Sequence, residues 1–342
     1  MEEIMMPINN TPMIRGAVVG YSRAFKMGQL HGEQMNQAGL EFAAVCEIDE
    51  ACLNQAKIDF PNIRTFQTIE ELLAQPDINL ITIITPHHTH AELAMKVLES
   101  GKHCILEKPM CIDTDDAEAL VRKAKEKGVM LSVYHNRRWD GWYLTLQDLI
   151  QKDLLGELFS VEMSIGGHGH PGYWWRSDKV VSGGAFYDWG AHYIDWLLGI
   201  VPGKMKSIRG FVQKRLWHDV TNEDHMESTI VFEGGAVANV QVSSIARAGK
   251  ANRRILGTKG AVISNHNENY LMLYTELNGL KVESKVPLMK DEWHNYYQNI
   301  ADHLLKGAEL IVKPEEARRI IAVLDTTAKS AAADRELPVP YE

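Results

Sequence analysis

The stretch INLITIITPHHTHAELAMKVLESGKHCILEKP, residues 78–109, alternates between two kinds of pattern. Residues 78–86 are rich in β-branched side chains and end in proline, which is typical of a buried strand. Residues 89–101 have helical character and end in glycine. Residues 102–109 form a second apolar run, which stops abruptly at Glu107, Lys108 and Pro109. The stretch therefore predicts a strand, a helix and a second strand with a charged end.

The same alternation covers the first third of the chain. We expect further strands at residues 14–22, 40–49 and 129–135, and helices at residues 26–38, 50–60, 68–75 and 113–128. Strands separated by helices of this length form right-handed βαβ units and a parallel sheet. Such sheets bind ligands at the carboxyl ends of their strands. Glu47, Thr85, Lys108 and Asn136 occupy these positions, so a charged strand end here predicts a site rather than a solvated edge.

The pattern changes after about residue 135. Helices are predicted at residues 143–156, 183–200, 293–307 and 314–335, and strands at residues 206–217, 227–246, 253–264, 268–276 and 281–288. The EGGA and GTKGA segments between these strands are turn signals. We therefore expect an α/β protein in which residues 1–134 form a parallel-sheet domain. Residues 135–342 should form an α+β domain with a mostly antiparallel, open sheet.

Composition limits the class of protein. The net charge is −9 and no long basic run occurs, which argues against a nucleic-acid partner. No apolar run is long enough to span a bilayer, and residues 1–13 lack the apolar core of a secretory signal. The four cysteines form no C-x-x-C pair, which favours free thiols in a reducing compartment. We expect a cytoplasmic protein with no membrane partner.

The loop after the first strand is GAVVGYSRAFKMGQLHG, residues 16–32. A strict G-x-G-x-x-G fingerprint would place glycine at positions 22 and 25, where the chain has Ser22 and Phe25, and Gly28 follows late. Alone, the loop fits an ordinary βα turn. However, it starts at Gly20 after a strand, it opens a helix, and the next strand ends in Glu47, the arrangement of a dinucleotide-binding Rossmann domain.

This arrangement predicts how a dinucleotide would bind. A carboxylate at Glu47 can accept hydrogen bonds from the ribose hydroxyls of NAD, and it would repel the 2′-phosphate of NADP. The backbone N–H groups of Ser22, Arg23, Ala24 and Phe25 are the expected pyrophosphate cradle, helped by the helix N-terminus. Arg23 could instead pair with a phosphate. We expect NAD as the cofactor, with NADP as the less favoured alternative.

A second polar cluster lies in SGGAFYDWGAHYID, residues 182–195. Asp188 and His192 are four residues apart, so they share one helix face, which Asp195 continues. Trp189 and Tyr193 belong to a core-facing stripe beside that face. A carboxylate one turn from an imidazole can accept its N–H and raise its basicity. A surface Asp–His pair is the alternative interpretation.

EKP at the end of the predicted fifth strand, followed some seventy-five residues later by GG-x₃-D-x₃-H, resembles the Gfo/Idh/MocA family of NAD(P)-dependent oxidoreductases. The resemblance covers nearly the whole chain, although the phosphate loop is longer than the family's usual pattern and lacks its second glycine. It implies that Lys108 reaches the reacting carbon and that Asp188 and His192 contact the substrate hydroxyl. We expect Lys108 and His192 to handle the proton, with Asp188 orienting them, and either of the two could be the base. The resemblance further implies a set of residues at the nicotinamide end of the cofactor: Thr85, Pro86, His90, Lys108 and Asn136. Glu107 is expected either to hold Lys108 or to touch the nicotinamide end.

The loop GGHGHPGYWWRSDK, residues 166–179, would lie across the active-site mouth in this family. Trp174, Trp175 and Arg176 suit a polyhydroxylated ring, because aromatic faces stack on C–H groups and arginine donates to hydroxyls. Arg137 is a further expected substrate contact. The predicted reaction is hydride transfer between a secondary alcohol of a sugar, cyclitol or related polyol and nicotinamide. Eliminative glycoside cleavage through transient oxidation, and a non-catalytic dinucleotide sensor, are the alternatives.

The remaining histidine clusters, PHHTH, HGHP and WHDVTNEDH, lack the spacing of a known zinc motif. We therefore expect no metal. An open sheet in the second half needs a cover, and self-association is the simplest one. The sequence accordingly predicts a homodimer or homotetramer.

Overall fold

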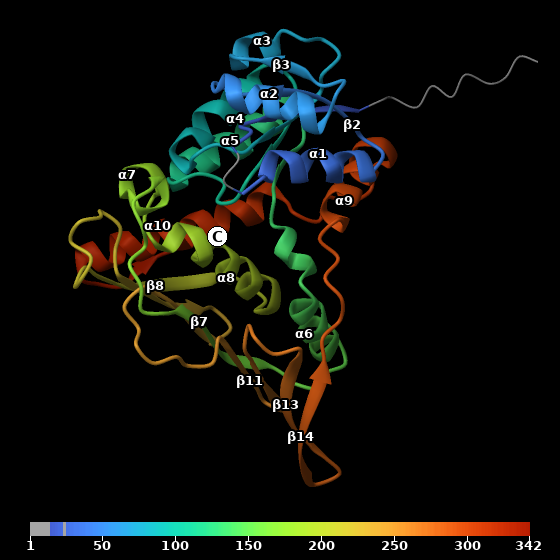
Figure 1. Cartoon of the computed structure of the whole chain (residues 1–342). Coiled ribbons are helices and arrows are strands. Elements are labelled where there is room, and N and C mark those ends of the chain that lie inside the picture. Colours follow the sequence, from blue (N-terminus) through green and yellow to red (C-terminus); the bar gives the residue numbers. More distant parts are fainter. Residues whose placement is uncertain (1–13, 23–24) are drawn as a thin grey trace, which may run out of the picture.

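The first sheet is the parallel sheet that the sequence predicts. The computed structural model describes residues 14–22 and 25–342, so Arg23 and Ala24 of the expected phosphate cradle lie outside the described residues (Figure 1). Six parallel strands follow the order β3-β2-β1-β4-β5-β6. Their bounds are β1 Arg15–Val19, β2 Glu41–Cys46, β3 Arg64–Phe66, β4 Leu80–Ile83, β5 His103–Leu106 and β6 Leu131–Val133. Only the three-residue β3 has no counterpart in the predicted elements, since so short a strand has no measurable period.

Helices connect these strands: α1 Met27–Gln37, α2 Glu50–Asp59, α3 Ile69–Leu73, α4 His90–Glu99 and α5 Thr114–Lys127. Their ends follow local chemistry. Thr68 and Glu71 form the predicted capping box of α3, and Gly128 ends α5 with φ 64°. The strand order reverses between β1 and β4, which opens a crevice at the carboxyl ends of these strands.

The second sheet has nine strands in the order β14-β13-β12-β11-β7-β10-β9-β8-β15. Their bounds are β7 Leu158–Gly166, β8 Met205–Gln213, β9 His225–Phe232, β10 Val237–Ser243, β11 Arg253–Gly257, β12 Gly260–Ser264, β13 Tyr270–Leu277, β14 Leu280–Pro287 and β15 Leu337–Pro338. All neighbours pair antiparallel except β7 and β10. The prediction of a mostly antiparallel sheet is therefore confirmed, but β7, its central strand, was not predicted because serines and a glutamate interrupt its apolar residues.

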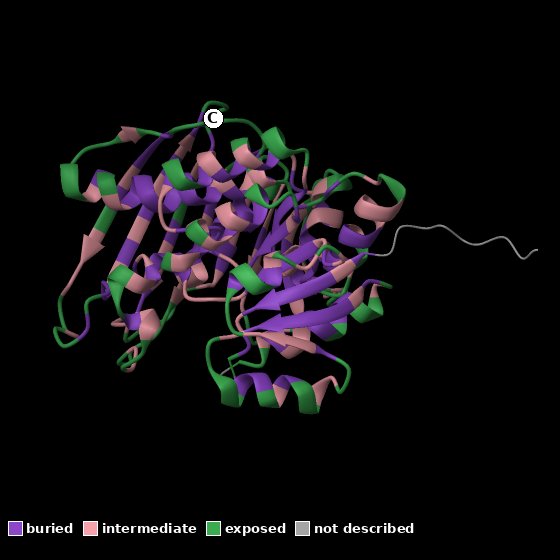
Figure 2. Ribbon diagram, turned by 90° about the horizontal axis from the view of Figure 1, so that it is seen from above, coloured by how far each residue is buried: buried purple, intermediate pink, exposed green. Residues whose placement is uncertain are grey.

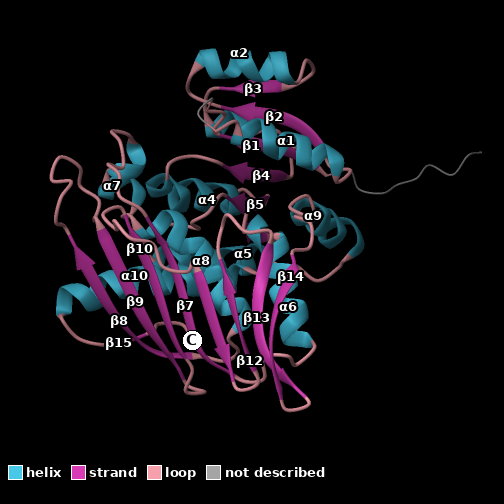
Figure 3. Ribbon diagram, turned by 60° about the horizontal axis from the view of Figure 1, so that its bottom comes forward, coloured by secondary structure: helices cyan, strands magenta, loops and turns pink. Residues whose placement is uncertain are grey.

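Helices cover one face of this sheet: α6 Gly141–Gln151, α8 Phe186–Ile200 and α10 Pro314–Ala333. Figure 3 shows them behind the strands, with the opposite face turned to the viewer. In Figure 2 the strands of the first sheet are buried over most of their length, whereas those of the second alternate between buried and more exposed residues. This difference is expected for a parallel sheet covered on both faces and a sheet covered on one.

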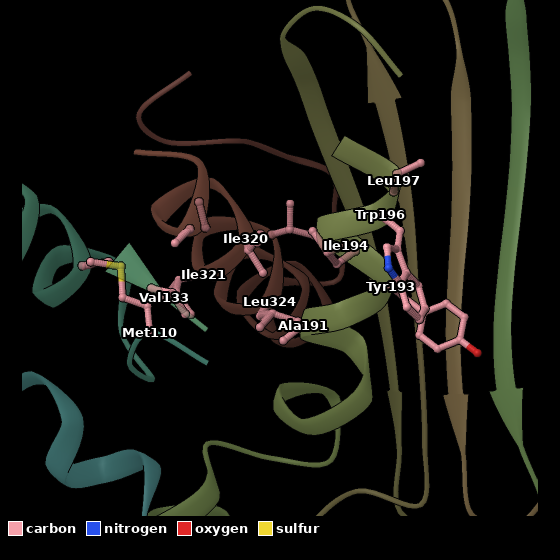
Figure 4. Close-up of a cluster of buried hydrophobic side chains, with 14 of the residues drawn as sticks. Met110, Val133, Ala191, Tyr193, Ile194, Trp196, Leu197, Ile320, Ile321 and Leu324 are labelled. Carbon is pink, nitrogen blue, oxygen red and sulfur yellow. The ribbon is translucent and has the colours of Figure 1, made fainter. Parts of the chain in front are cut away.

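The two sheets share a continuous apolar core in which α10 lies between them. Figure 4 shows this core. Met110, which follows β5, and Val133 of β6 lie in one buried cluster with Leu324 of α10. The same cluster includes Ala191 and Ile194 of α8. The helix α9 (Asn295–Lys306) lies in a second cluster, with the first sheet. The division into two domains at residue 134 therefore stays a prediction. Helix α9 belongs to the second part of the sequence but packs against the first sheet.

Further short elements complete the chain: α7 Lys179–Ser182 and the single 3₁₀ turns η1 His87–Thr89, η2 Asn136–Trp139 and η3 Trp175–Ser177. None of the helices in the described part of the chain is long and apolar enough to cross a membrane.

Candidate active site

A cavity of about 500 Å³ lies between the carboxyl ends of the first sheet's strands and the start of α8. This volume is in the range of small-molecule sites. Most of the predicted site residues line it: Ser22, Phe25, Thr85, Pro86, Glu107, Lys108, Asn136, Arg137, Trp175, Arg176, Asp188 and His192. Gly20, Glu47, His90 and Trp174 are outside its lining.

Lys108 and Asp188 form the central pair of this cavity. Lys108 follows β5, and its Nζ donates to Asp188 Oδ1 at 2.6 Å and to the Asp188 carbonyl at 3.3 Å. Arg176 Nη1 donates to the same Oδ1 at 2.9 Å. Burial alone would raise the pKa of Asp188, but the two cations, Lys108 first, outweigh it and lower the pKa to about 2. The carboxylate therefore stays ionised and fixes the Lys108 ammonium.

His192 lies in the same cavity but has a different environment from the one expected. No hydrogen bond joins it to Asp188 in the described structure, because both cations hold that carboxylate, so the predicted Asp188–His192 pair is not formed. The imidazole stacks on Trp196 with ring centres 6.1 Å apart and meets the Trp189 edge at 5.6 Å. Burial, followed by the charge of Lys108, holds the pKa of His192 well below its usual range. The ring is therefore a neutral base.

Asp195, which was expected to continue the Asp188–His192 face, serves another purpose. Its carboxylate accepts hydrogen bonds from Arg138, whose Nη2 lies 2.7 Å from Oδ1. Arg138 also donates to Glu316 at 2.7 Å and so ties α8 to α10. Asp195 is a structural anchor for α8, not a part of the cavity.

Glu107 ends a buried hydrogen-bonded chain. Its Oε2 accepts the Lys108 backbone N–H at 3.0 Å, and its Oε1 lies 3.1 Å from His31 Nε2. His31 Nδ1 lies 2.8 Å from the Tyr297 hydroxyl, which is 3.0 Å from Thr82 Oγ1. Burial would raise the pKa of Glu107, but the hydrogen bond and charge of His31 lead the effects that lower it. An ionised Glu107 therefore holds the backbone of the Lys108 loop.

Two histidines of the PHHTH segment differ in whether they reach the cavity. His90 was expected beside the nicotinamide ribose, but it is fully buried, and its ring nitrogens each lie 2.8 Å from a carbonyl, that of Pro109 and that of Thr85. It ties the end of β4 to the loop after β5. His87 lines the cavity instead. The signal for His87 was its place directly after the strand-end Thr85–Pro86 pair, since a histidine cluster that binds no metal more often lies in a loop or at the rim of an active site.

Aromatic rings and arginines form the outer wall. Trp175 and Arg176 line the cavity as predicted, whereas Trp174 lies beside it and packs on Phe25 with ring centres 5.7 Å apart. The Arg137 guanidinium lies 5.0 Å from the Trp189 ring centre. Trp189, predicted in the core stripe, therefore faces the cavity. Trp293 and Tyr134 also line it, and the pattern of their segments gave no sign of this.

The start of the first βα unit fits a dinucleotide. Gly20 has φ 99°, and a Cβ there would lie 2.7 Å from the Ile84 carbonyl oxygen, so only glycine allows the β1 and β4 ends to approach so closely. Glu47 follows β2 as predicted. Its carboxylate accepts backbone N–H groups of Tyr21 at 2.7 Å, Ile48 at 2.7 Å and Asp49 at 3.2 Å. It can accept about one further hydrogen bond, which leaves room for a ribose hydroxyl.

Comparison with known proteins decides the family. Residues 14–135 match a model described as the oxidoreductase family with an NAD-binding Rossmann fold, and residues 143–263 match the GFO/IDH/MocA C-terminal domain. The chain belongs to the Gfo/Idh/MocA family. It is therefore an NAD(P)-dependent oxidoreductase, and the predicted fold class and enzyme class are confirmed.

Full-length relatives agree with this assignment. The chain is 27% identical over 351 residues to scyllo-inositol 2-dehydrogenase (NADP(+)) IolW of Bacillus subtilis (strain 168), covering 96% of each protein. Among solved structures, the oxidoreductase yvaA from Bacillus subtilis superposes with a TM-score of 0.85 at 25% identity, covering 96% of this chain and 99% of that one. A levoglucosan dehydrogenase in complex with NADH and levoglucosan has a TM-score of 0.83 at 20% identity, covers 96% and 99%, and so shares the fold.

This Gfo/Idh/MocA protein shows no metal-binding group of three or more ligands among its described residues. The acids of WHDVTNEDH have other partners. Asp224 accepts the Leu216 backbone N–H at 2.6 Å, and Glu223 accepts the Ala185 N–H at 3.0 Å at the start of α8. These carboxylates shape the loops around the site.

Proposed function

We propose that this enzyme oxidises a secondary alcohol of a cyclic polyol, a cyclitol or a sugar, with NAD as the preferred cofactor. The observation that carries the proposal is the Lys108 Nζ–Asp188 Oδ1 contact of 2.6 Å in a cavity that the neutral His192 also lines. An ammonium and a neutral base at one cavity are what removal of a hydroxyl proton requires. The relative that acts on scyllo-inositol supports a ring with several hydroxyls as the substrate class.

The reaction removes a hydride from carbon and a proton from oxygen. Thr85, Pro86 and Asn136 would hold the nicotinamide end of NAD, which would supply the hydride acceptor. The hydroxyl proton passes to His192, which the surrounding burial and cations keep unprotonated. As the C–O bond becomes a carbonyl, the Lys108 ammonium donates a hydrogen bond to the oxygen and stabilises its developing negative charge. In the reverse direction His192 returns the proton, and Lys108 again stabilises the charge on the oxygen.

Asp188 positions Lys108 for this step. Lys108 donates to the carboxylate and to the carbonyl oxygen of Asp188, which leaves one N–H of the ammonium for the substrate. The two residues lie 80 positions apart in the chain, Lys108 after β5 and Asp188 in α8, so their contact joins the two sheets' sides of the cavity. The alcohol is thereby positioned relative to a cofactor bound along the first sheet.

The outer wall suits a polyol. Trp175 and Trp189 offer ring faces for C–H groups, and Arg137 and Arg176 offer N–H donors for hydroxyl oxygens. Among the described residues the Arg137 guanidinium donates one hydrogen bond, to Asp140 at 3.4 Å, so its remaining N–H donors are available to a ligand.

The test is formation of reduced nicotinamide from a panel of scyllo-inositol, myo-inositol, glucose and levoglucosan, each with NAD and with NADP. Lys108→Ala should lower kcat by about 10²–10⁴-fold on the responding polyol. Lys96→Ala, an exposed change on α4, should leave it unchanged. Full activity of Lys108→Ala would refute the catalytic assignment. Glycoside cleavage without net reduced cofactor would identify the eliminative alternative.

A further inference from the structure

His87 is a buried histidine of the cavity wall that the proposed mechanism does not use. It lies in η1, directly after β4, and its Nδ1 lies 2.8 Å from the carbonyl oxygen of Ser182, beyond the domain boundary. A carbonyl oxygen only accepts, so Nδ1 carries the hydrogen. In the neutral ring Nε2 then has a free lone pair and can only accept a hydrogen bond.

The ring is fixed in this orientation. Trp175 meets it edge-on, with ring centres 4.8 Å apart, and His87 is 3% exposed. Burial, followed by the charge of neighbouring His90, holds the pKa of His87 well below its usual range, so the ring stays neutral. No described residue hydrogen-bonds to Nε2, although the ring lines the cavity. Nε2 is not one of the fully buried side-chain atoms that lack a partner, so it is open to the cavity, where a ligand can donate a hydrogen bond to it.

Lys108 does not donate a hydrogen bond to His87 Nε2 in the described structure. His87, Lys108 and His192 line the same cavity. The ammonium itself is turned onto Asp188. A ligand with two hydroxyls can therefore present one to His192 and Lys108 and the other to His87.

We propose that His87 Nε2 accepts a hydrogen bond from a second substrate hydroxyl, on the carbon next to the one that is oxidised, so that the enzyme selects vicinal diols. The inference rests on the proposed polyol dehydrogenase function and adds a specificity-determining residue to it. The hydroxyl that loses its proton meets His192 and Lys108. Its neighbour keeps its hydrogen and donates to His87 throughout the reaction.

Two substitutions separate this role from a structural one. In His87→Gln the longer side chain places an amide oxygen where Nε2 lies and keeps the acceptor. In His87→Asn the shorter amide keeps a donor for the Ser182 carbonyl and loses the acceptor. His88→Ala is the matched control, because His88 is exposed and outside the cavity lining. Each variant is assayed with cis- and trans-cyclohexane-1,2-diol and with cyclohexanol, at saturating oxidised cofactor.

We expect His87→Asn to lower kcat/KM for the better diol by about tenfold, the effect of one hydrogen bond, and to change that for cyclohexanol by less than about twofold. His87→Gln should restore most of the activity on the diol. The affinity for NAD, measured by calorimetry without substrate, should be equal in all variants.

Other outcomes would overturn the inference. Rescue by Asn and not by Gln would mean that the bond to Ser182 is what matters. Equal losses on diol and cyclohexanol, or a loss of NAD affinity, would assign His87 to the fold or to the cofactor. Oxidation of scyllo-inositol but of neither diol would also contradict it. If the wild-type protein oxidises no polyol at all, the proposed function fails first and the inference fails with it.

Discussion

At the scale of single residues, the site depends on which charges meet. The helical spacing correctly placed Asp188 and His192 on one face, but it did not show that Asp188 would bind Lys108 and Arg176 instead of the imidazole. Two cations attract a carboxylate more strongly than a neutral ring does. The consequence is that Asp188 fixes the Lys108 ammonium, and the proposed mechanism accordingly uses His192, not an Asp188–His192 pair, as the base.

The first prediction concerns Glu47 and the choice of cofactor. Glu47→Gln keeps the shape of the side chain and an acceptor for the Tyr21 N–H, but it removes the negative charge that would face a 2′-phosphate. We expect the ratio of kcat/KM for NAD to that for NADP to fall by about tenfold. Steady-state kinetics with both cofactors measures this ratio, and Glu50→Gln on α2 is the control. An unchanged ratio would show that the charge of Glu47 does not select the cofactor and that its carboxylate only holds the backbone of nearby loops.

At the scale of elements, α9 determines how Glu107 is held. The sequence predicted this helix within residues 293–307, but only the structure shows that it packs on the first sheet. Tyr297 of α9 joins His31 of α1 to Thr82 of β4 by hydrogen bonds of 2.8 and 3.0 Å. A helix from the end of the chain thus stabilises the cofactor domain.

The second prediction removes that hydroxyl. Tyr297→Phe leaves His31 and Thr82 without a shared partner in a fully buried place, which should lower the free energy of unfolding by about 1–3 kcal/mol. Urea unfolding measures it. Tyr270→Phe is the matched control, because its hydroxyl bonds only to Glu268, two residues away. Equal effects of the two substitutions would show that the buried chain adds no stability.

At the scale of the whole molecule, the nine-stranded sheet has one face without helices in the described part of the chain (Figure 3). Strand pairing places Phe211 opposite Glu227 on that face, and Phe211 is 43% exposed. The pairs Leu256–Ala261 and Ile263–Met272 add apolar, half-buried side chains. Exposed apolar area of this kind favours association of two sheets.

The third prediction is that the protein is a homodimer or homotetramer that associates through this face. Leu256→Asp should convert it to smaller species in light scattering at micromolar concentration, because a charge would be buried in the interface. Ile58→Asp, on the exposed side of α2, should not. A monomeric wild-type protein would refute the prediction.

The fourth prediction concerns stability against pH. Burial holds the pKa values of His87, His135 and His192 below the ordinary value in the folded protein. The unfolded chain binds these protons below about pH 6.5, and the folded one does not. Stability should therefore be unaffected above about pH 7.5 and fall by at least about 1 kcal/mol on going to about pH 5.5. Urea unfolding at both pH values measures it, and a constant value would show that these rings titrate normally.

The sequence by itself determined most of the elements and their order, with β3 and β7 as the exceptions named above. Alternating apolar runs and helical periods fix local structure, and βαβ units allow only a parallel sheet, so the carboxyl ends of its strands, with Lys108 among them, were identifiable. The glycine pair and the spacing of Asp188 and His192 are also local, since both belong to the start of one helix. The sequence could therefore indicate the α8 side of the candidate site as well.

Only the tertiary structure decided which groups meet. It paired Asp188 with two cations, buried His90 behind the cavity and turned His87 into it, and placed α9 on the first sheet. It also inserted β7 at the centre of the second sheet, next to a strand far along the chain. These outcomes depend on contacts between residues distant in sequence, and neither periodicity nor spacing carries information about such contacts. Local order is therefore encoded locally, whereas the chemistry of the site arises where the two halves pack together.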